Sequence, residues 1–120
     1  MPLVSMLRHR EAQGAATPMA IIYSARTWDE FIYRDELVSL ESGDSSLSLA
    51  FAVTREPAQR AGDYSRRIDA SMVSELLARL PEAPARVFVC GSNRFVEAAA
   101  GAAIAEGVAT AIIRTERYGG

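Results

Sequence analysis

Short apolar runs alternate along the chain with segments in which apolar residues recur at helical spacing. A continuous apolar run of about four to eight residues is typical of a parallel strand that is covered on both faces. The pattern predicts strands at residues 19–25, 47–53, 86–89 and 109–115, separated by helices at residues 27–40, 69–80 and 94–106. Strands that alternate with helices in this way predict an α/β fold with a doubly wound parallel sheet.

Capping residues set the expected ends of these helices. Thr27 and Glu30 are spaced as a capping box, Asp69 is an N-cap residue, and Gly107 closes the third helix. Residues 54–67 lack periodicity and are long for a loop in a compact domain, so we expect them to have a functional role. The second helix should bury one apolar face, made of Met72, Val73, Leu76, Leu77 and Leu80.

Composition limits the classes of protein that remain. The 120 residues, 49% hydrophobic and 23% charged, fit one globular domain over residues 1–120. The net charge is −2 and there is no dense basic block, so we expect neither nucleic acid nor a membrane surface as partner. Cys90 is the only cysteine, and no apolar run approaches the ~20 residues of a membrane span, which favours the cytoplasm. His9 has no ligand-spaced partner, so no metal site is expected.

The carboxyl ends of the predicted strands should carry any binding site, because ligands of doubly wound sheets lie beyond these ends. Arg26 follows the first predicted strand, where its fork of donors suits an adenosine ribose or its 2′-phosphate. Ser24 could add a neutral donor, whereas a solvated loop role for Arg26 remains open. The side chains expected to share this rim are Ser24, Arg26, Thr54, Arg55, Cys90–Asn93 and Arg114–Tyr118.

Cys90 has three interpretations from its sequence context. It is a small packed side chain, a nucleophile activated before a helix, or part of a wall against a flat cofactor ring. A phosphatase loop needs an arginine six residues after its cysteine, but that position is Val96, and Arg94 lies only four residues on. The nucleophile interpretation is therefore disfavoured. Gly91 would let the backbone approach a ring closely, which keeps the wall interpretation open.

Four segments together carry a resemblance to a known family. They are PLVSMLRHR, IIYSARTWDEFIYRDEL, FVCGSNRFVEAAAGAAIAEGV and IIRTERYGG, in this order. The combination resembles the NAD(P)-binding domain of the ferredoxin-NADP reductase superfamily, a Rossmann-like domain with a three-layer parallel sheet. It is most similar to the bacterial flavin-dependent reductases that supply electrons to oxygenases, ferredoxins or flavodoxins. The likeness covers nearly the whole chain.

The resemblance implies an NAD(P)H-dependent flavin oxidoreductase, with NADP or NAD as cofactor and FAD or FMN held by a separate flavin-binding domain or subunit. Ser24 and Arg26 would then contact the adenosine ribose and its 2′-phosphate, with Arg34 a further candidate nearby. Cys90 and Gly91 would lie beside the nicotinamide.

The same resemblance gives the remaining candidate site residues. Ser92 follows the cysteine-glycine corner as another cofactor-binding residue. Glu116 would serve as an acidic group near the flavin, and Tyr118 would cover the flavin ring. The hydride chemistry belongs to the cofactors, and the protein positions them.

Two departures from the family give further expectations. The chain shows no flavin barrel and begins inside the helix that should follow the glycine-rich pyrophosphate loop, so the domain is expected to be amino-terminally truncated and inactive alone. Loss of two charge-assisted hydrogen bonds of ~1.5–3 kcal/mol each would weaken nucleotide binding roughly 100-fold or more.

The first family strand would also be missing from the centre of the sheet. The sheet would then have a central gap, with an unpaired edge that favours a homodimer or a complementing partner, or it would close in another arrangement.

A degenerate, non-catalytic nucleotide-binding or interaction module is the alternative function.

Overall fold

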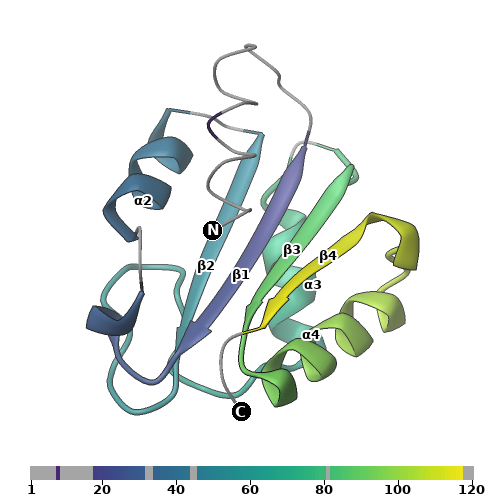
Figure 1. Ribbon diagram of the computed structural model, residues 1–120. Helices are drawn as coiled ribbons and strands as arrows, with labels where there is room; N and C mark the ends of the chain where they lie inside the picture. Colours follow the sequence, from purple (N-terminus) through teal and green to yellow (C-terminus); the bar gives the residue numbers. More distant parts are fainter. Residues whose placement is uncertain (1–7, 9–17, 32–33, 44–45, 81, 118–120) are drawn as a thin grey trace.

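Four parallel strands form one continuous sheet with helices on both faces (Figure 1). The computed structural model describes residues 8, 18–31, 34–43, 46–80 and 82–117. The predicted α/β fold class is confirmed. The elements are β1 (Met19–Ala25), η1 (Trp28–Glu30), α2 (Arg34–Ser42), β2 (Leu47–Val53), α3 (Ala70–Ala78), β3 (Arg86–Gly91), α4 (Asn93–Ala105), η2 (Thr110–Ile112) and β4 (Ile113–Arg117).

The strand order β2-β1-β3-β4 decides between the two expected arrangements of the sheet. Met19 of β1 pairs with Leu47 of β2 on one side and with Arg86 of β3 on the other. The described sheet therefore closes without a central gap, and the unpaired interior edge that was expected to favour a dimer is not formed. The order reverses between β1 and β3, which is the position where ligands of doubly wound sheets bind.

The strand boundaries follow the apolar runs closely except at the last strand. Strands β1 and β2 cover the predicted residues, and β3 extends two residues further, to Gly91. Strand β4 begins at Ile113 and not at residue 109, because the preceding residues form a 3-10 turn in which the Ile112 N–H donates to the Ala109 carbonyl (3.2 Å). As an edge strand, β4 is mostly exposed, so its apolar pattern is short.

The helix predicted at residues 27–40 is wrong as a single element. The Thr27 N–H donates to Glu30 Oε1 (3.1 Å), so the expected capping contact forms, but it closes only the single turn η1. Phe31 then leaves the helical conformation (φ −72°, ψ 107°) and is buried. Its ring packs 4.9 Å from that of Tyr23 and 4.5 Å from that of Phe51. We attribute the break to the burial of this ring, after which α2 begins at Arg34.

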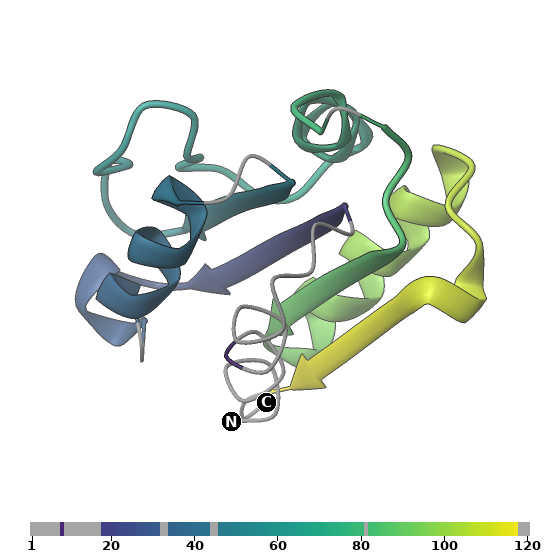
Figure 2. The ribbon, with the colours of Figure 1, turned by 90° about the horizontal axis from the view of Figure 1, so that it is seen from above.

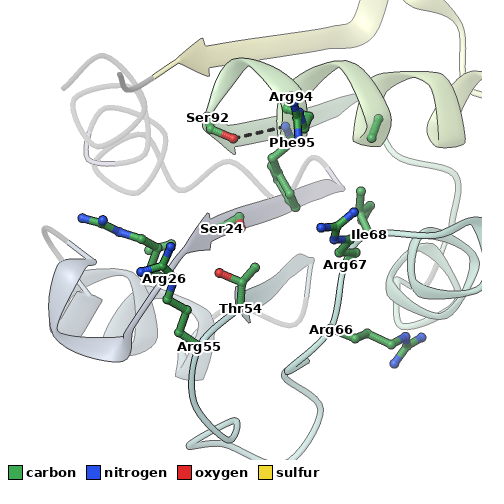
Figure 3. Close-up of a pocket in the computed structure, with 12 residues that line it drawn as sticks. Ser24, Arg26, Thr54, Arg55, Arg66, Arg67, Ile68, Ser92, Arg94 and Phe95 are labelled. Atoms are coloured by element: carbon green, nitrogen blue, oxygen red, sulfur yellow. Dashed lines mark hydrogen bonds between the residues drawn. The ribbon is translucent and has the colours of Figure 1, made fainter. Parts of the chain in front are cut away.

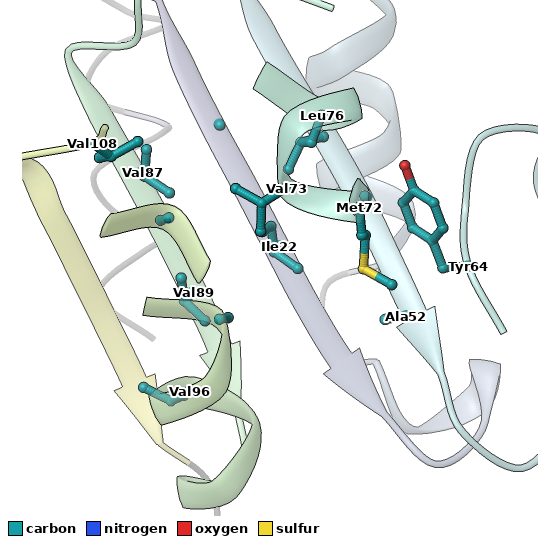
Figure 4. Packing of buried hydrophobic residues seen from close by; sticks show 14 of the residues in the cluster. Ile22, Ala52, Tyr64, Met72, Val73, Leu76, Val87, Val89, Val96 and Val108 are labelled. Atoms are coloured by element: carbon teal, nitrogen blue, oxygen red, sulfur yellow. The ribbon is translucent and has the colours of Figure 1, made fainter. Parts of the chain in front are cut away.

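Two hydrophobic cores lie on opposite faces of the sheet, one under α3 and α4 and the other under α2, as Figure 2 shows for α3 and α2. Asp69 caps α3 by accepting the Met72 N–H (2.8 Å), as expected. Of the predicted apolar face of α3, Met72, Val73 and Leu76 are fully buried against the sheet (Figure 4), Leu77 is partly buried, and Leu80 is buried but lies beyond the end of the helix. None of the helices in the described part of the chain is long and apolar enough to cross a membrane.

The outer edge of β2 is covered by side chains and by a loop. Three of its backbone N–H groups have acceptors there: Leu49 donates to Glu41 (2.8 Å), Phe51 to Asp63 (3.0 Å) and Val53 to the Tyr64 carbonyl (2.9 Å). An edge strand with satisfied N–H groups is a poor template for pairing with another chain. This edge is therefore closed to strand addition.

Candidate functional site

Two adjoining clefts lie at the carboxyl ends of β1, β2 and β3, where the sequence predicted a binding site. The large cleft has a volume of about 750 Å³ and lies between the ends of β1 and β2, residues 66–68 and the first turns of α4 (Figure 3). The small cleft, about 380 Å³, lies between the end of β1, Glu30 and the Gly91-Ser92 corner. Ser24, Arg26 and Ser92 line both clefts, so the structure brings these three predicted site residues together.

Arg26 is exposed and is held at the junction of the clefts by an ion pair. Its Nη2 lies 2.9 Å from Glu30 Oε2, four residues on. The hydrogen bond from Arg26 holds the pKa of the Glu30 carboxyl below its ordinary value. An ion pair this exposed contributes little to stability, and a phosphate can compete for the guanidinium. Arg26 is therefore available to an anionic ligand in either cleft.

Ser92 is the N-cap residue of α4, and its hydroxyl accepts the Phe95 N–H (3.2 Å). Gly91, the residue before it, lies under the ring of Phe95. A Cβ atom at Gly91 would lie 2.8 Å from Phe95 Cδ2 and 3.3 Å from Ser24 Cβ. The glycine therefore allows α4 to approach the end of β1 closely, whether or not a ligand is present.

Replacing Gly91 by alanine should lower the free energy of unfolding by about 1–3 kcal/mol, because the new methyl group overlaps the Phe95 ring. Urea unfolding followed by circular dichroism measures this change. Gly101→Ala is the matched control, since nothing lies within 4 Å of the added atom on the exposed face of α4. The control should gain about 0.5–1 kcal/mol from helix propensity. Equal stability of the two variants would contradict the close packing of Gly91.

Cys90 is fully buried and packs in the core under α2. Burial raises the pKa of its thiol, and the carboxylate of Glu116, its register partner on β4, raises it further. The thiol therefore stays protonated at neutral pH, as expected for a packed side chain and not for a nucleophile. Among the described residues that line the two clefts, neither Cys90 nor Glu116 is found.

Arg34 is not brought to either cleft. Its Nη1 donates to the Trp28 carbonyl (2.9 Å), and its guanidinium lies 5.0 Å from the centre of the Trp28 ring. Arg34 therefore connects α2 to η1 and lines neither cleft. Tyr118, the expected cover of the flavin ring, lies outside the described residues.

Sequence reasoning missed part of the large cleft. Arg66, Arg67, Arg94 and Phe95 line it, but none of them was expected at the site. For Arg66 and Arg67 the signal was the length of residues 54–67, since the side chains of that segment have no periodicity that assigns them to a face. Arg94 and Phe95 directly follow the predicted rim residues Cys90–Asn93. In the part of the chain that the structure describes, no group of His, Cys, Asp or Glu side chains could hold a metal ion.

Comparison with known proteins gives the class to which this fold and site belong. Residues 1–101 match the family model described as the oxidoreductase NAD-binding domain, and the chain belongs to this family. The resemblance to the NAD(P)-binding domain of ferredoxin-NADP reductases is thereby confirmed.

Curated relatives include ferredoxin--NADP reductase B of Sorangium cellulosum (strain So ce56), 32% identical over 120 residues, with 98% of this chain and 49% of the relative covered. The reductase component of propane 2-monooxygenase from Mycolicibacterium goodii is 31% identical over 102 residues, with 83% and 29% covered. The chain thus spans about half or less of the length of these relatives.

Solved structures agree on the fold. The CS-b5R domains of human Ncb5or in the NAD+ form match with a TM-score of 0.72 and 20% identity, covering 96% of this chain and 33% of that one. Flavohemoglobin from Malassezia yamatoensis with bound FAD and heme matches with a TM-score of 0.70 and 24% identity, covering 98% and 28%. These similarities confirm the Rossmann-like fold.

Proposed function

We propose that this domain binds NADPH or NADH in the two clefts and is the pyridine-nucleotide part of a flavin-dependent reductase. The observation that carries the proposal is the meeting of Ser24, Arg26 and Ser92 at the junction of the clefts, at the topological switch point of an NAD-binding fold. The volume of the large cleft lies within the range of about 300–1,000 Å³ usual for ligand pockets.

The residues around the clefts fit the nucleotide in chemistry. Ser24 and Arg26 would bind the adenosine ribose and its 2′-phosphate, since a guanidinium binds phosphate through two donors. The Gly91-Ser92 corner, supported from inside by the packed Cys90, would hold the nicotinamide end in the small cleft. When bound, the nicotinamide supplies a hydride and a flavin accepts it. This chain would bind and orient the nucleotide, and we propose Glu116 as the acidic group on the flavin side.

Partners follow from the same proposal. A flavin-binding domain or subunit would carry FAD or FMN, and a ferredoxin, flavodoxin or oxygenase would accept the electrons, as the names of the two curated relatives suggest. If the chain forms a homodimer by strand addition, β4 is the edge that the topology leaves for it, because the edge of β2 is covered. We place the domain in the cytoplasm, where the thiol of its single cysteine stays reduced.

A non-catalytic nucleotide-binding module is the second candidate. The observation in its favour is that both catalytic candidates, Cys90 and Glu116, lie off the surfaces of the clefts. Such a module would bind nucleotide but would not support NADPH-dependent reduction of a flavin domain added in trans.

Calorimetric titration of the chain with NADP+ and with NAD+ tests the proposal. NADP+ should bind, and Arg26→Gln should weaken its binding by about 10-fold or more, because a charge-assisted hydrogen bond is worth ~1.5–3 kcal/mol. NAD+ binding should change less, since it lacks the 2′-phosphate. Arg114→Gln is the matched control, as Arg114 is exposed on β4 and lines neither cleft. A folded chain that binds neither nucleotide contradicts autonomous nucleotide binding.

A further inference from the structure

The large cleft has a concentration of positive charge that the 2′-phosphate contacts of Arg26 do not explain. Five of the 13 basic residues of the chain line it, although the net charge of the chain is −2. No carboxylate is among the described residues that line this cleft. The five are Arg26, Arg55, Arg66, Arg67 and Arg94.

Two of these arginines are already paired. Arg26 is bound to Glu30, and Arg66 lies 3.2 Å from Asp69 and over the ring of Tyr64. In Figure 3 the guanidinium of Arg66 points away from the cleft. Although Arg66 lies on the rim, its guanidinium is therefore held by Asp69 and Tyr64 and is directed away from a ligand in the cleft.

The other three arginines are not paired with a carboxylate in the described part of the chain. Arg55, Arg67 and Arg94 are exposed and, within the described ranges, make no ion pair and no side-chain hydrogen bond. Arg55 lies beside Arg26, because its N–H donates to the Arg26 carbonyl (2.9 Å). Arg67 and Arg94 come instead from the segment before α3 and from the first turn of α4.

The five arginines therefore line one cleft from different elements. In the view of Figure 3, Ser24 and Thr54 lie between Arg26 and Arg55 on one side and Arg67 on the other. Arg94 and Phe95 line the cleft from α4, and Phe95 and Ile68 add apolar surface to it. A ligand that fills the cleft would therefore meet guanidinium groups on opposite sides, with hydroxyl groups between them.

We propose that Arg67 and Arg94 bind the pyrophosphate group of the dinucleotide, while Arg26 and Arg55 bind the ribose phosphate. This inference rests on the proposed function. A pyrophosphate carries two adjacent anionic groups, and two guanidinium groups from separate elements can each bind one through paired donors. In this chain, side chains would then supply contacts that many dinucleotide-binding folds obtain from backbone amides at a helix N-terminus.

Calorimetric titration of the full chain with four probes tests the assignment: NADP+, NAD+, 2′-AMP and inorganic pyrophosphate. Arg67→Gln and Arg94→Gln should each weaken NADP+, NAD+ and pyrophosphate binding by about 10- to 100-fold, and leave 2′-AMP binding within about twofold. Arg26→Gln should weaken 2′-AMP and NADP+. Arg114→Gln is the matched control, since Arg114 is exposed on β4 and lines neither cleft, so loss of the same charge there should leave all four affinities nearly unchanged. Circular dichroism confirms that each variant is folded.

The outcomes separate this inference from the proposed function. If NADP+ binds equally to the unaltered chain and to the Arg67 and Arg94 variants, the pyrophosphate assignment is overturned and nucleotide binding stands. If only pyrophosphate binds, and both variants lose it, the anion site stands and autonomous dinucleotide binding fails. If none of the four probes binds, both are wrong.

Discussion

Replacing Phe51 by alanine should lower the free energy of unfolding by about 3–5 kcal/mol, a large share of the roughly 5–15 kcal/mol typical of a domain. Phe51 is fully buried in the middle of β2. Its ring centre lies 4.5 Å from that of Phe31, 5.2 Å from that of Trp28 and 6.2 Å from that of Tyr23, so the substitution leaves a cavity and removes these three aromatic contacts. Because these contacts hold η1 beside the end of β1, the position of Arg26 depends on them.

Urea unfolding followed by circular dichroism measures the effect as a shift of the midpoint at unchanged slope. Ile104→Ala serves as control, since Ile104 is 48% exposed on α4 and should change the free energy of unfolding by less than about 0.5 kcal/mol. A loss of less than about 1 kcal/mol in the Phe51 variant would show that its ring is not packed as described.

Replacing both Glu41 and Asp63 by alanine should cost about 2–6 kcal/mol and cause the chain to self-associate. Each carboxylate accepts a backbone N–H of β2, and an unsatisfied buried donor costs about 1–3 kcal/mol. Arg60 would lose both of its carboxylate partners as well. The uncovered edge of β2 would then be free to pair with a second chain.

Light scattering at micromolar concentration, together with urea unfolding, tests this expectation. The double variant Glu82→Ala and Glu106→Ala is a control that removes the same charge from two exposed positions. If the Glu41 and Asp63 variant matches the unaltered chain in both size and stability, the carboxylates do not protect the edge.

The buried carboxyl group of Asp63 should also make the free energy of unfolding depend on pH. Burial raises the pKa of its carboxyl above the ordinary value. The folded state therefore binds the proton more tightly than the unfolded state, so the contribution of Asp63 to stability falls as pH rises from about 3.9 to the raised pKa. Asp63→Asn keeps an acceptor for the Phe51 N–H and should remove this decline.

Part of the candidate site follows from the sequence because strand ends can be located from apolar runs. The runs at residues 19–25 and 47–53 place Ser24, Arg26, Thr54 and Arg55 at one rim of the sheet, and all four line the large cleft. Arg34 shows the limit of this reasoning. The family resemblance implied a role for Arg34 near Arg26, but Trp28 and Phe31 turn the chain so that Arg34 binds the Trp28 carbonyl instead.

The sequence by itself determined the buried strands and the start of α3, because burial on both faces of a parallel strand leaves a continuous apolar run, and an N-cap residue marks where a helix begins. The bounds of β1 and β2 and the N-cap at Asp69 were fixed in this way. Only the tertiary structure decided that β1 pairs directly with β3, that Phe31 interrupts a helix, and that Arg67 and Arg94 share a cleft. These outcomes depend on contacts between residues far apart in the chain, which leave no periodic signal in either segment alone.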